Sequence, residues 1–405
     1  MKARARSQSK ICLPAGFSFS SACAGIKTSG QPDLALVEAS PGTTAAAMFT
    51  KNLVVAAPLE VGRASLLASQ GTVRAVIVNS GNANCATGEA GMRACQQVCR
   101  DLARLLGLRA SEVFPSSTGI IGVPLPVKKI AAKLPGLVAA RQATKQGVAD
   151  FSRAIMTTDT RPKLACAAFI SRQTAVNILG IAKGAGMIHP QLATMLVYLF
   201  TDVAANSTEL KHALRGSCQQ TFNHISIDGD TSTNDTLLLL ASGKSGVALK
   251  KAGVKKCFSA GLLQVCQSLA DQIVSDGEGV EHVVHLIVER ARNREEARQV
   301  ARTVAHSLLV KSAWAGADPN WGRILAAVGR SGIAIDPAKI SIKIGDQTVC
   351  RRGVGCAFDA NRAHQAMAEP SCEIRIQLGR GSSSILFLTT DLTPEYVRIN
   401  ADYST

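Results

Sequence analysis

Apolar residues recur along the chain with two different periods, which predict where strands and helices lie. Runs that are apolar throughout, or that alternate in period two, predict buried strands at residues 34–39, 74–79, 195–200, 282–288, 340–344, 373–378 and 385–388. Apolar residues spaced three or four apart predict helices over residues 88–108, 257–275 and 293–308. Strands grouped with long helices predict mixed sheets covered by helices, in an α/β or an α+β fold, and the pattern alone leaves both open.

One helix start carries a specific signal. Asn293 precedes the third helical pattern and Glu296 follows three residues later. This spacing predicts a capping box, in which each side chain accepts a hydrogen bond from the backbone N–H of the other residue.

The composition is that of a globular protein with a large core, since 46% of the 405 residues are hydrophobic. No apolar run approaches the roughly 20 residues that cross a bilayer, so no membrane partner is expected. Residues 1–10 are basic and precede no sustained apolar segment, which predicts a tail without a targeting role.

The cysteines and the net charge restrict the location and the partners. The 12 cysteines are scattered singly, as in a reducing compartment, which predicts a cytoplasmic protein. Cys95 and Cys99, four apart, are expected to face the core from one side of a helix. The net charge of +16 suits anionic small substrates or solubility alone. Aromatic residues make up only 4% of the chain and the basic residues are dispersed, so nucleic acid is not an expected partner.

The segment from Lys183 to Asp202 is the most informative for chemistry. A glycine-rich loop holding Lys183 leads through His189 to Ala193 and Thr194, directly before the apolar run 195–200. Spacing alone favours an ordinary strand residue at Thr194, because threonine is common in strands. Cleavage before Thr194 would free an α-amino group whose pKa of about 7.7–8.0 suits a base for the neighbouring hydroxyl. The hypothesis is therefore a terminal threonine nucleophile.

Other polar segments offer weaker signals. Thr118 and Gly119, in PSSTGIIG, could supply an oxyanion hole or could form only a turn. Residues 79–88 are dense in turn residues, and nothing in the sequence assigns them a function. Residues 226–236 are predicted to form a packed polar loop rather than a Ca²⁺ site. No nucleophile elbow, Walker loop or dinucleotide fingerprint is found. His282 and His285 lack a metal-binding pattern, so no metal is expected.

Taken together, these runs resemble the ornithine acetyltransferase family, the glutamate N-acetyltransferases of arginine biosynthesis. The matching runs occur in order over nearly the whole chain: AGFSFSSACAGIK, DLALV, VNSGNAN, STGIIG, IMTTDT, KGAGMIHP, DGDTSTNDT, DPNWGRILAAVG and YVRINADYST. Each run is weak alone, and their shared order makes the resemblance specific.

The resemblance implies a self-processing fold of the N-terminal-nucleophile type and a set of site residues. The cleaved bond corresponds to Ala193–Thr194, which gives an α chain of residues 1–193 and a β chain of residues 194–405. Thr194 is the nucleophile, and Thr118 and Gly119 form the oxyanion hole. The implied substrate contacts are Thr157, Lys183, Thr194, Glu278, Asn400 and Thr405.

The implied reaction is acetyl transfer from N-acetylornithine to glutamate through an acetyl-Thr194 ester, without a cofactor. Whether acetyl-CoA also serves as a donor stays open, and the implied assembly is an α₂β₂ heterotetramer. Gln191-Leu192 and Val123 depart from the family's usual residues. An amidohydrolase or aminopeptidase with the same kind of nucleophile is the nearest alternative, and a basic nucleic-acid-binding protein is an alternative from another class.

Overall fold

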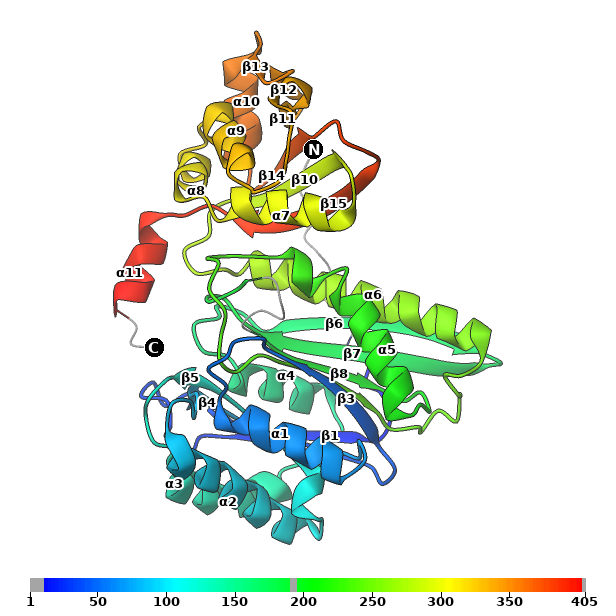
Figure 1. Cartoon of the computed structure of the whole chain (residues 1–405). Coiled ribbons are helices and arrows are strands. Elements are labelled where there is room, and N and C mark those ends of the chain that lie inside the picture. The colour runs from blue at the N-terminus through cyan, green and yellow to red at the C-terminus, as the bar shows by residue number, and fades with distance from the viewer. Residues whose placement is uncertain (1–10, 190–194, 403–405) are drawn as a thin grey trace.

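A larger lobe and a smaller lobe make up the computed structural model, which describes residues 11–189 and 195–402 (Figure 1). Ala193, Thr194, Gln191, Leu192 and Thr405 therefore lie outside the described residues, as does the basic segment 1–10.

The larger lobe contains two sheets. In spatial order, the first sheet consists of β1 (Phe17–Ala22), β2 (Leu34–Ala39), β4 (Ala75–Asn82) and β5 (Val113–Ile120). The second sheet consists of β3 (Thr44–Phe49), β9 (Thr236–Ala241), β8 (Leu196–Thr201), β7 (Thr174–Lys183) and β6 (Lys163–Ser171). Both sheets mix parallel and antiparallel pairs, as the prediction of mixed sheets requires.

These two sheets pack face to face. Their strands carry apolar side chains on both faces of the sheet, so one face can pack on the other sheet and the opposite face on helices. In β8, Tyr198 and Phe200 enter the core between the sheets, whereas Val197 and Leu199 face the opposite side. There α5 (Ser207–Cys218) and α6 (Ala252–Val274) cover the second sheet. The outer face of the first sheet is covered by α1 (Ala57–Ala68), α2 (Gly88–Leu106) and α3 (Val127–Ala139). The result is a helix–sheet–sheet–helix sandwich, with α4 (Lys145–Ala154) packed against β1 (Figure 1).

The smaller lobe is built on the third sheet, with its own core. Its spatial order is β13 (Val354–Gly355), β12 (Gln347–Arg351), β11 (Ser341–Ile344), β14 (Ser371–Gln377), β10 (Val283–Ala291) and β15 (Ser383–Thr390). The lobe also contains α7 (Arg294–Ala305), α8 (Leu308–Ala315), α9 (Trp321–Gly329) and α10 (Ala360–Ala368). After β15 the chain forms α11 (Pro394–Asp402), which extends back beside the larger lobe (Figure 1).

The strands predicted from apolar runs are all present, with ends shifted by a few residues. Residues 34–39 form β2 as predicted, and the fully buried run after Thr194 forms β8 from Leu196. The turn considered for residues 116–119 is wrong, since these residues continue β5 in register with β4. The predicted packed polar loop is confirmed, because Ser226, Ser232 and Asn234 are buried.

The predicted helices are present, with two corrections. Cys95 and Cys99 face the core from α2, as expected. The third helix ends at Ala305, since the chain leaves helical geometry at His306, whose ring packs against His189. Leu308 instead begins α8 and is 68% exposed.

The capping box at the start of α7 is only half formed. The Asn293 side chain accepts the N–H of Glu296 at 2.9 Å, as predicted. The Glu296 carboxylate pairs with Arg380 and not with the Asn293 backbone, because this guanidinium lies next to it.

Strands from both sides of residues 190–194 share the second sheet. β3, β6 and β7 precede that segment, β8 and β9 follow it, and β8 pairs with β7 from Ile178↔Thr201 to Lys183↔Leu196. The predicted α and β chains are thus not spatial domains within the described structure.

Among the described helices, none combines the length and the apolar character that a membrane span needs. The cysteines, all of which fall in the described ranges, are free thiols.

Candidate active site

The predicted site residues that the structure describes gather at one small pocket. Thr118, Gly119, Thr157, Lys183 and Glu278 line a cavity of about 70 Å³. Asn400, on α11, reaches the same place by donating from its side-chain amide to Glu278 at 2.9 Å. The pocket lies where β5 and β7 end, beside the polar loop 226–236 that leads into β9.

Gly119 has a backbone that only glycine fits. Its φ of +130° lies in a region that other residues avoid. A Cβ atom here would also lie 2.4 Å from the carbonyl carbon of Gly81 and 2.5 Å from the nitrogen of Asn82. The close approach of β4 to β5 at this point therefore depends on Gly119.

Buried amides hold the ends of β4 and β5 in place. The side-chain amide of Asn234 donates to the carbonyls of Ala83 at 2.7 Å and of Ser117 at 2.9 Å. The Ser117 hydroxyl donates to the Asn79 side-chain oxygen at 2.6 Å. Because buried polar groups are costly when unpaired, this network fixes the backbone on which Thr118 sits.

Lys183 lies behind Thr118. Its ammonium donates to the Thr118 hydroxyl oxygen at 3.1 Å, and the two residues are 5% and 8% exposed. Burial lowers the pKa of Lys183, and the nearby Asp159 carboxylate opposes this shift.

Asp159 belongs to a buried ionic network beside the pocket. It accepts from Lys163 at 2.6 Å, from the Gly184 N–H at 2.7 Å and from the Thr157 N–H at 3.0 Å. Lys163 donates also to Asp276 at 2.6 Å. Burial alone would raise the pKa of Asp159, but the ammonium groups of Lys163 and Lys183 outweigh it and hold the pKa at about 2.

Glu278 enters the pocket from the loop after α6. Its N–H donates to the Ala185 carbonyl at 2.9 Å. A Cβ atom on Gly186 would lie 2.3 Å from its carboxylate oxygen, so the glycine-rich loop makes room for the acid. The pocket thus carries an ammonium group and a carboxylate group on different walls.

Two further aspartates anchor the chain on either side of residues 190–194. Asp228 accepts the N–H groups of Met187 and Ile188, the latter at 2.9 Å, and burial raises its pKa to about 6. Met187 has a φ of +57°, a strained conformation for a non-glycine residue, and lines the pocket.

Asp235 is the second anchor. Its Oδ1 accepts the N–H of Met195 at 3.0 Å, directly after Thr194. Its Oδ2 is buried and has no hydrogen-bond partner within residues 11–189 and 195–402. Burial raises the pKa of Asp235 well above its usual range.

Sequence reasoning assigned no role to Asp159, Lys163, Asp228, Asn234 or Asp235. The available signal was a set of polar residues inside otherwise apolar surroundings, such as Asp235 directly before the apolar strand β9. Val123, one of the residues that depart from the usual family pattern, has an exposed side chain. Its carbonyl accepts a hydrogen bond from the Asn82 side-chain amide at 3.0 Å.

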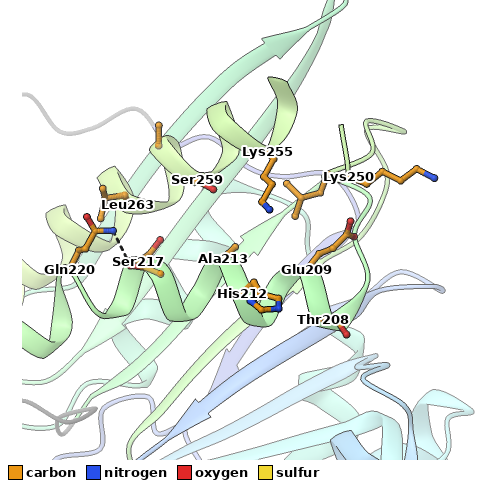
Figure 2. A pocket seen from close by; sticks show the side chains of 13 residues that line it. Thr208, Glu209, His212, Ala213, Ser217, Gln220, Lys250, Lys255, Ser259 and Leu263 are labelled. Atoms are coloured by element: carbon orange, nitrogen blue, oxygen red, sulfur yellow. Dashed lines mark hydrogen bonds between the residues drawn. The ribbon is translucent and has the colours of Figure 1, made fainter. Parts of the chain in front are cut away.

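A larger cavity lies elsewhere, between α5 and α6. Figure 2 shows its lining, which includes His212, Ser217, Lys250 and Lys255, around a volume of about 660 Å³. It shares no residue with the pocket at Thr118, so size alone does not identify the active site.

The histidine pair considered for a metal does not form one site. Among described residues, only Glu281, His282 and Asp391 bring metal-type ligand atoms within 4.8 Å of one another, and His285 is not among them. The Asp391 carboxylate already accepts the N–H groups of Glu281 at 3.3 Å and His282 at 3.1 Å. These hydrogen bonds explain why the three side chains lie close together, with Asp391 holding the backbone of Glu281 and His282.

The sandwich fold and a small pocket of hydroxyl, ammonium and carboxylate groups define an α/β enzyme acting on small polar molecules. The sequence model of the ArgJ family matches residues 18–405, and the chain belongs to this family. The family resemblance inferred from the motifs is thereby confirmed.

The chain is similar to two curated relatives called arginine biosynthesis bifunctional protein ArgJ. That of Thermus thermophilus is 45% identical over 397 residues, covering 98% of this chain and 100% of the relative. That of Methylococcus capsulatus is 42% identical over 400 residues, covering 98% and 97%. A solved ArgJ chain from Bacillus halodurans is 37% identical, with a TM-score of 0.50, and covers 52% of this chain and 100% of its own length.

Proposed function

We propose that this protein transfers the acetyl group of N-acetylornithine to glutamate, as a step of arginine biosynthesis. The observation that carries the proposal is the single pocket that gathers Thr118, Gly119, Lys183 and Glu278, lined also by the loop just before Asp235, which accepts the Met195 N–H. The names of the relatives support the pathway, and the family motifs support the reaction.

The proposed nucleophile is Thr194, freed by self-cleavage after Ala193. Its α-amino group takes the proton of its own hydroxyl, directly or through water, and the oxygen attacks the acetyl carbonyl. The Thr118 hydroxyl and the Gly119 N–H stabilise the oxyanion. Ornithine leaves with the proton, and the amine of glutamate then attacks the acetyl-Thr194 ester.

Contacts in the pocket support this assignment. Because the Lys183 ammonium donates to Thr118 Oγ1, the Thr118 hydroxyl proton points elsewhere and is free for an oxyanion. The positive charge behind this hydroxyl also makes it a stronger donor.

The amino-acid substrates are zwitterions, which fits a pocket with charges of both signs. Lys183 is placed to meet a carboxylate and Glu278 to meet an ammonium, with Thr157 and Asn400 beside them. Thr405 is a further substrate contact in this proposal, carried over from the family.

The proposed cut divides the site between two chains. Thr118, Thr157 and Lys183 lie on the proposed α chain and Glu278 and Asn400 on the β chain, so the site needs both.

The remaining parts of the proposal concern partners and location. The exchange of one amide for another needs no cofactor, and acetyl-CoA is the candidate second donor. We further propose an α₂β₂ heterotetramer in the cytoplasm, a location that the free thiols support. Light scattering tests the assembly, because two copies of the 42.4 kDa chain give a mass twice that value.

The decisive experiment compares the wild type with Thr194→Ala and Thr194→Ser by intact mass under denaturing conditions and by acetyl transfer. The wild type is expected to give two fragments divided at 193/194, and Thr194→Ala one intact chain without transfer. Thr194→Ser retains a hydroxyl and should keep partial processing. Full transfer by Thr194→Ala would refute the proposal, and acetate release without transfer to glutamate would favour an amidohydrolase.

A further inference from the structure

A third cavity, of about 320 Å³, lies between the two lobes and has no role in the proposed transfer reaction. We call it the interlobe cavity. Its polar lining includes His224 from the segment after α5, Gln267 from α6, Arg294 from α7 and Ser384 from β15. It shares no lining residue with the pocket at Thr118.

His224 is a buried side chain without a partner. It is 9% exposed, and its imidazole makes no hydrogen bond within the described ranges. Its ring nitrogens are not among the described polar atoms that are both sealed from solvent and unpaired, so they are accessible. Because His224 lines the interlobe cavity, its free ring nitrogens are available to a ligand there.

Arg294 lines the same cavity with an unused positive charge. In the described part of the chain its guanidinium makes neither an ion pair nor a hydrogen bond, whereas the neighbouring Arg298 pairs with Glu295. Arg294 is the first residue of α7, where a cation is disfavoured by the helix dipole. Arg294 is an exposed residue, and an anion bound in the cavity would complement its charge.

Backbone donors line another wall. β15 is the last strand of the third sheet, and the Leu388 carbonyl accepts the Ser226 N–H at 2.9 Å across its outer edge. Since backbone direction alternates along a strand, the polar groups of Leu386 and Ser384 also point outward. Among the described strands, none pairs with that part of the edge.

The rest of the lining is aliphatic and the volume is small. Ile225, Ile287 and Ile385 contribute apolar surface. A volume of about 320 Å³ lies at the lower end of the range for small-molecule sites, roughly 300–1,000 Å³. The cavity therefore suits a compact molecule with one anionic end and one aliphatic end.

We propose that the interlobe cavity binds a small organic carboxylate with an aliphatic chain. The carboxylate pairs with Arg294 and accepts from His224 and from the open edge of β15, and the chain packs on the isoleucines. This inference is independent of the proposed acetyl transfer, because neither its residues nor its test involves that reaction.

The state of His224 gives the proposal a second readout. Burial, and after it the charges of Arg294 and Arg298, lower the pKa of His224 to about 4, with Glu295 acting in the opposite direction. His224 is thus neutral near pH 7 in the free protein. A bound carboxylate would favour its protonated form and raise this pKa.

The test uses isocaproate as the probe and the uncharged isocaproamide as its isostere, titrated into the wild-type protein by calorimetry. Saturable binding of the acid is expected, with the amide at least about tenfold weaker. Arg294→Gln should lose at least about tenfold in affinity for the acid, while Arg292→Gln, an exposed arginine that does not line the cavity, should not change it.

NMR of the imidazole groups supplies the second measurement, with His224→Gln used to assign the signal. The pKa of His224 should rise on saturation with isocaproate. Equal binding of the acid and the amide, or equal binding by Arg294→Gln, would overturn the proposal. So would the absence of saturable binding up to the solubility limit of isocaproate.

Discussion

The Lys183 ammonium donates a hydrogen bond of 3.1 Å to the hydroxyl oxygen of Thr118, inside the pocket. This contact joins β7 to β5, which belong to different sheets, and it sets the direction in which the Thr118 hydroxyl can donate. The two layers of the sandwich therefore meet at the atoms proposed to stabilise the transition state.

Removing the Thr118 hydroxyl tests this role. Thr118→Val keeps the shape of the side chain but leaves no donor for the oxyanion, and kcat for acetyl transfer should fall about 10²–10³-fold. Thr118→Ser retains the donor and should stay within about tenfold of the wild type. Steady-state kinetics on both variants, matched for thermal stability, checks the difference, and equal kcat values would contradict the assignment.

A methyl group at Gly119 should disrupt the approach of β4 to β5. Gly119→Ala places its Cβ 2.4 Å from the Gly81 backbone at a φ of +130°, so backbone must move. We expect the variant to lose more than about 3 kcal/mol of unfolding free energy, or to be insoluble.

The matched control is Gly107→Ala. Gly107 also has a positive φ, +64°, but its Cβ would meet nothing within 4 Å. Only the backbone strain of about 1 kcal/mol is then expected. Urea denaturation compares the two, and similar losses would show that the close contact is not the cause.

Asp159→Asn should be strongly destabilising. It leaves the fully buried Lys163 with one carboxylate, Asp276, where it now has two at 2.6 Å. Breaking a buried ion pair costs about 3–5 kcal/mol. The exposed pair Glu89–Arg93 is the control, since Glu89→Gln should cost less than about 1 kcal/mol. Comparable urea midpoints for the two variants would contradict the expectation.

Acid should lower the free energy of unfolding through His306, whose ring contacts His189. Burial, followed by the charges of His189 and Arg302, lowers the pKa of His306 from 6.5 to about 3. Because the unfolded state binds the proton more readily, the neutral ring contributes stability that is present above about pH 6.5 and is lost as the pH falls towards 3.

In His306→Gln the loss of unfolding free energy between about pH 7 and pH 5 should be smaller by about 2 kcal/mol than in the wild type. Chemical denaturation at both pH values measures the difference, and identical slopes for wild type and His306→Gln would refute the explanation.

The elements with regular apolar periods could be predicted from the sequence. α2 and the alternating strands β11 and β14 follow from local patterns, because burial of one face dictates the spacing of their residues. The end of α7 at Ala305 could not, because the apolar spacing continues to Leu308, whereas His306 contacts His189, more than a hundred residues earlier.

The candidate site likewise contains residues that sequence motifs identify and residues that only the structure reveals. Thr118, Lys183 and Glu278 came from motifs, and the structure brings them to one pocket. Asp159 and Asp235 act through burial and distant partners, such as the contact of Asp235 with Met195, and no local spacing reveals such contacts. The position of Thr194 itself lies outside the described residues.

The order of strands in the second sheet has a consequence for the folding and the persistence of the protein. β8 and β9 lie between β3 on one side and β7 and β6 on the other, so strands from beyond residue 194 are enclosed by strands from before it. The proposed cut therefore has to follow folding. Once both fragments are unfolded, joining them becomes a bimolecular search between two aggregation-prone apolar pieces. The mature enzyme would then owe its persistence to slow unfolding rather than to reversible refolding.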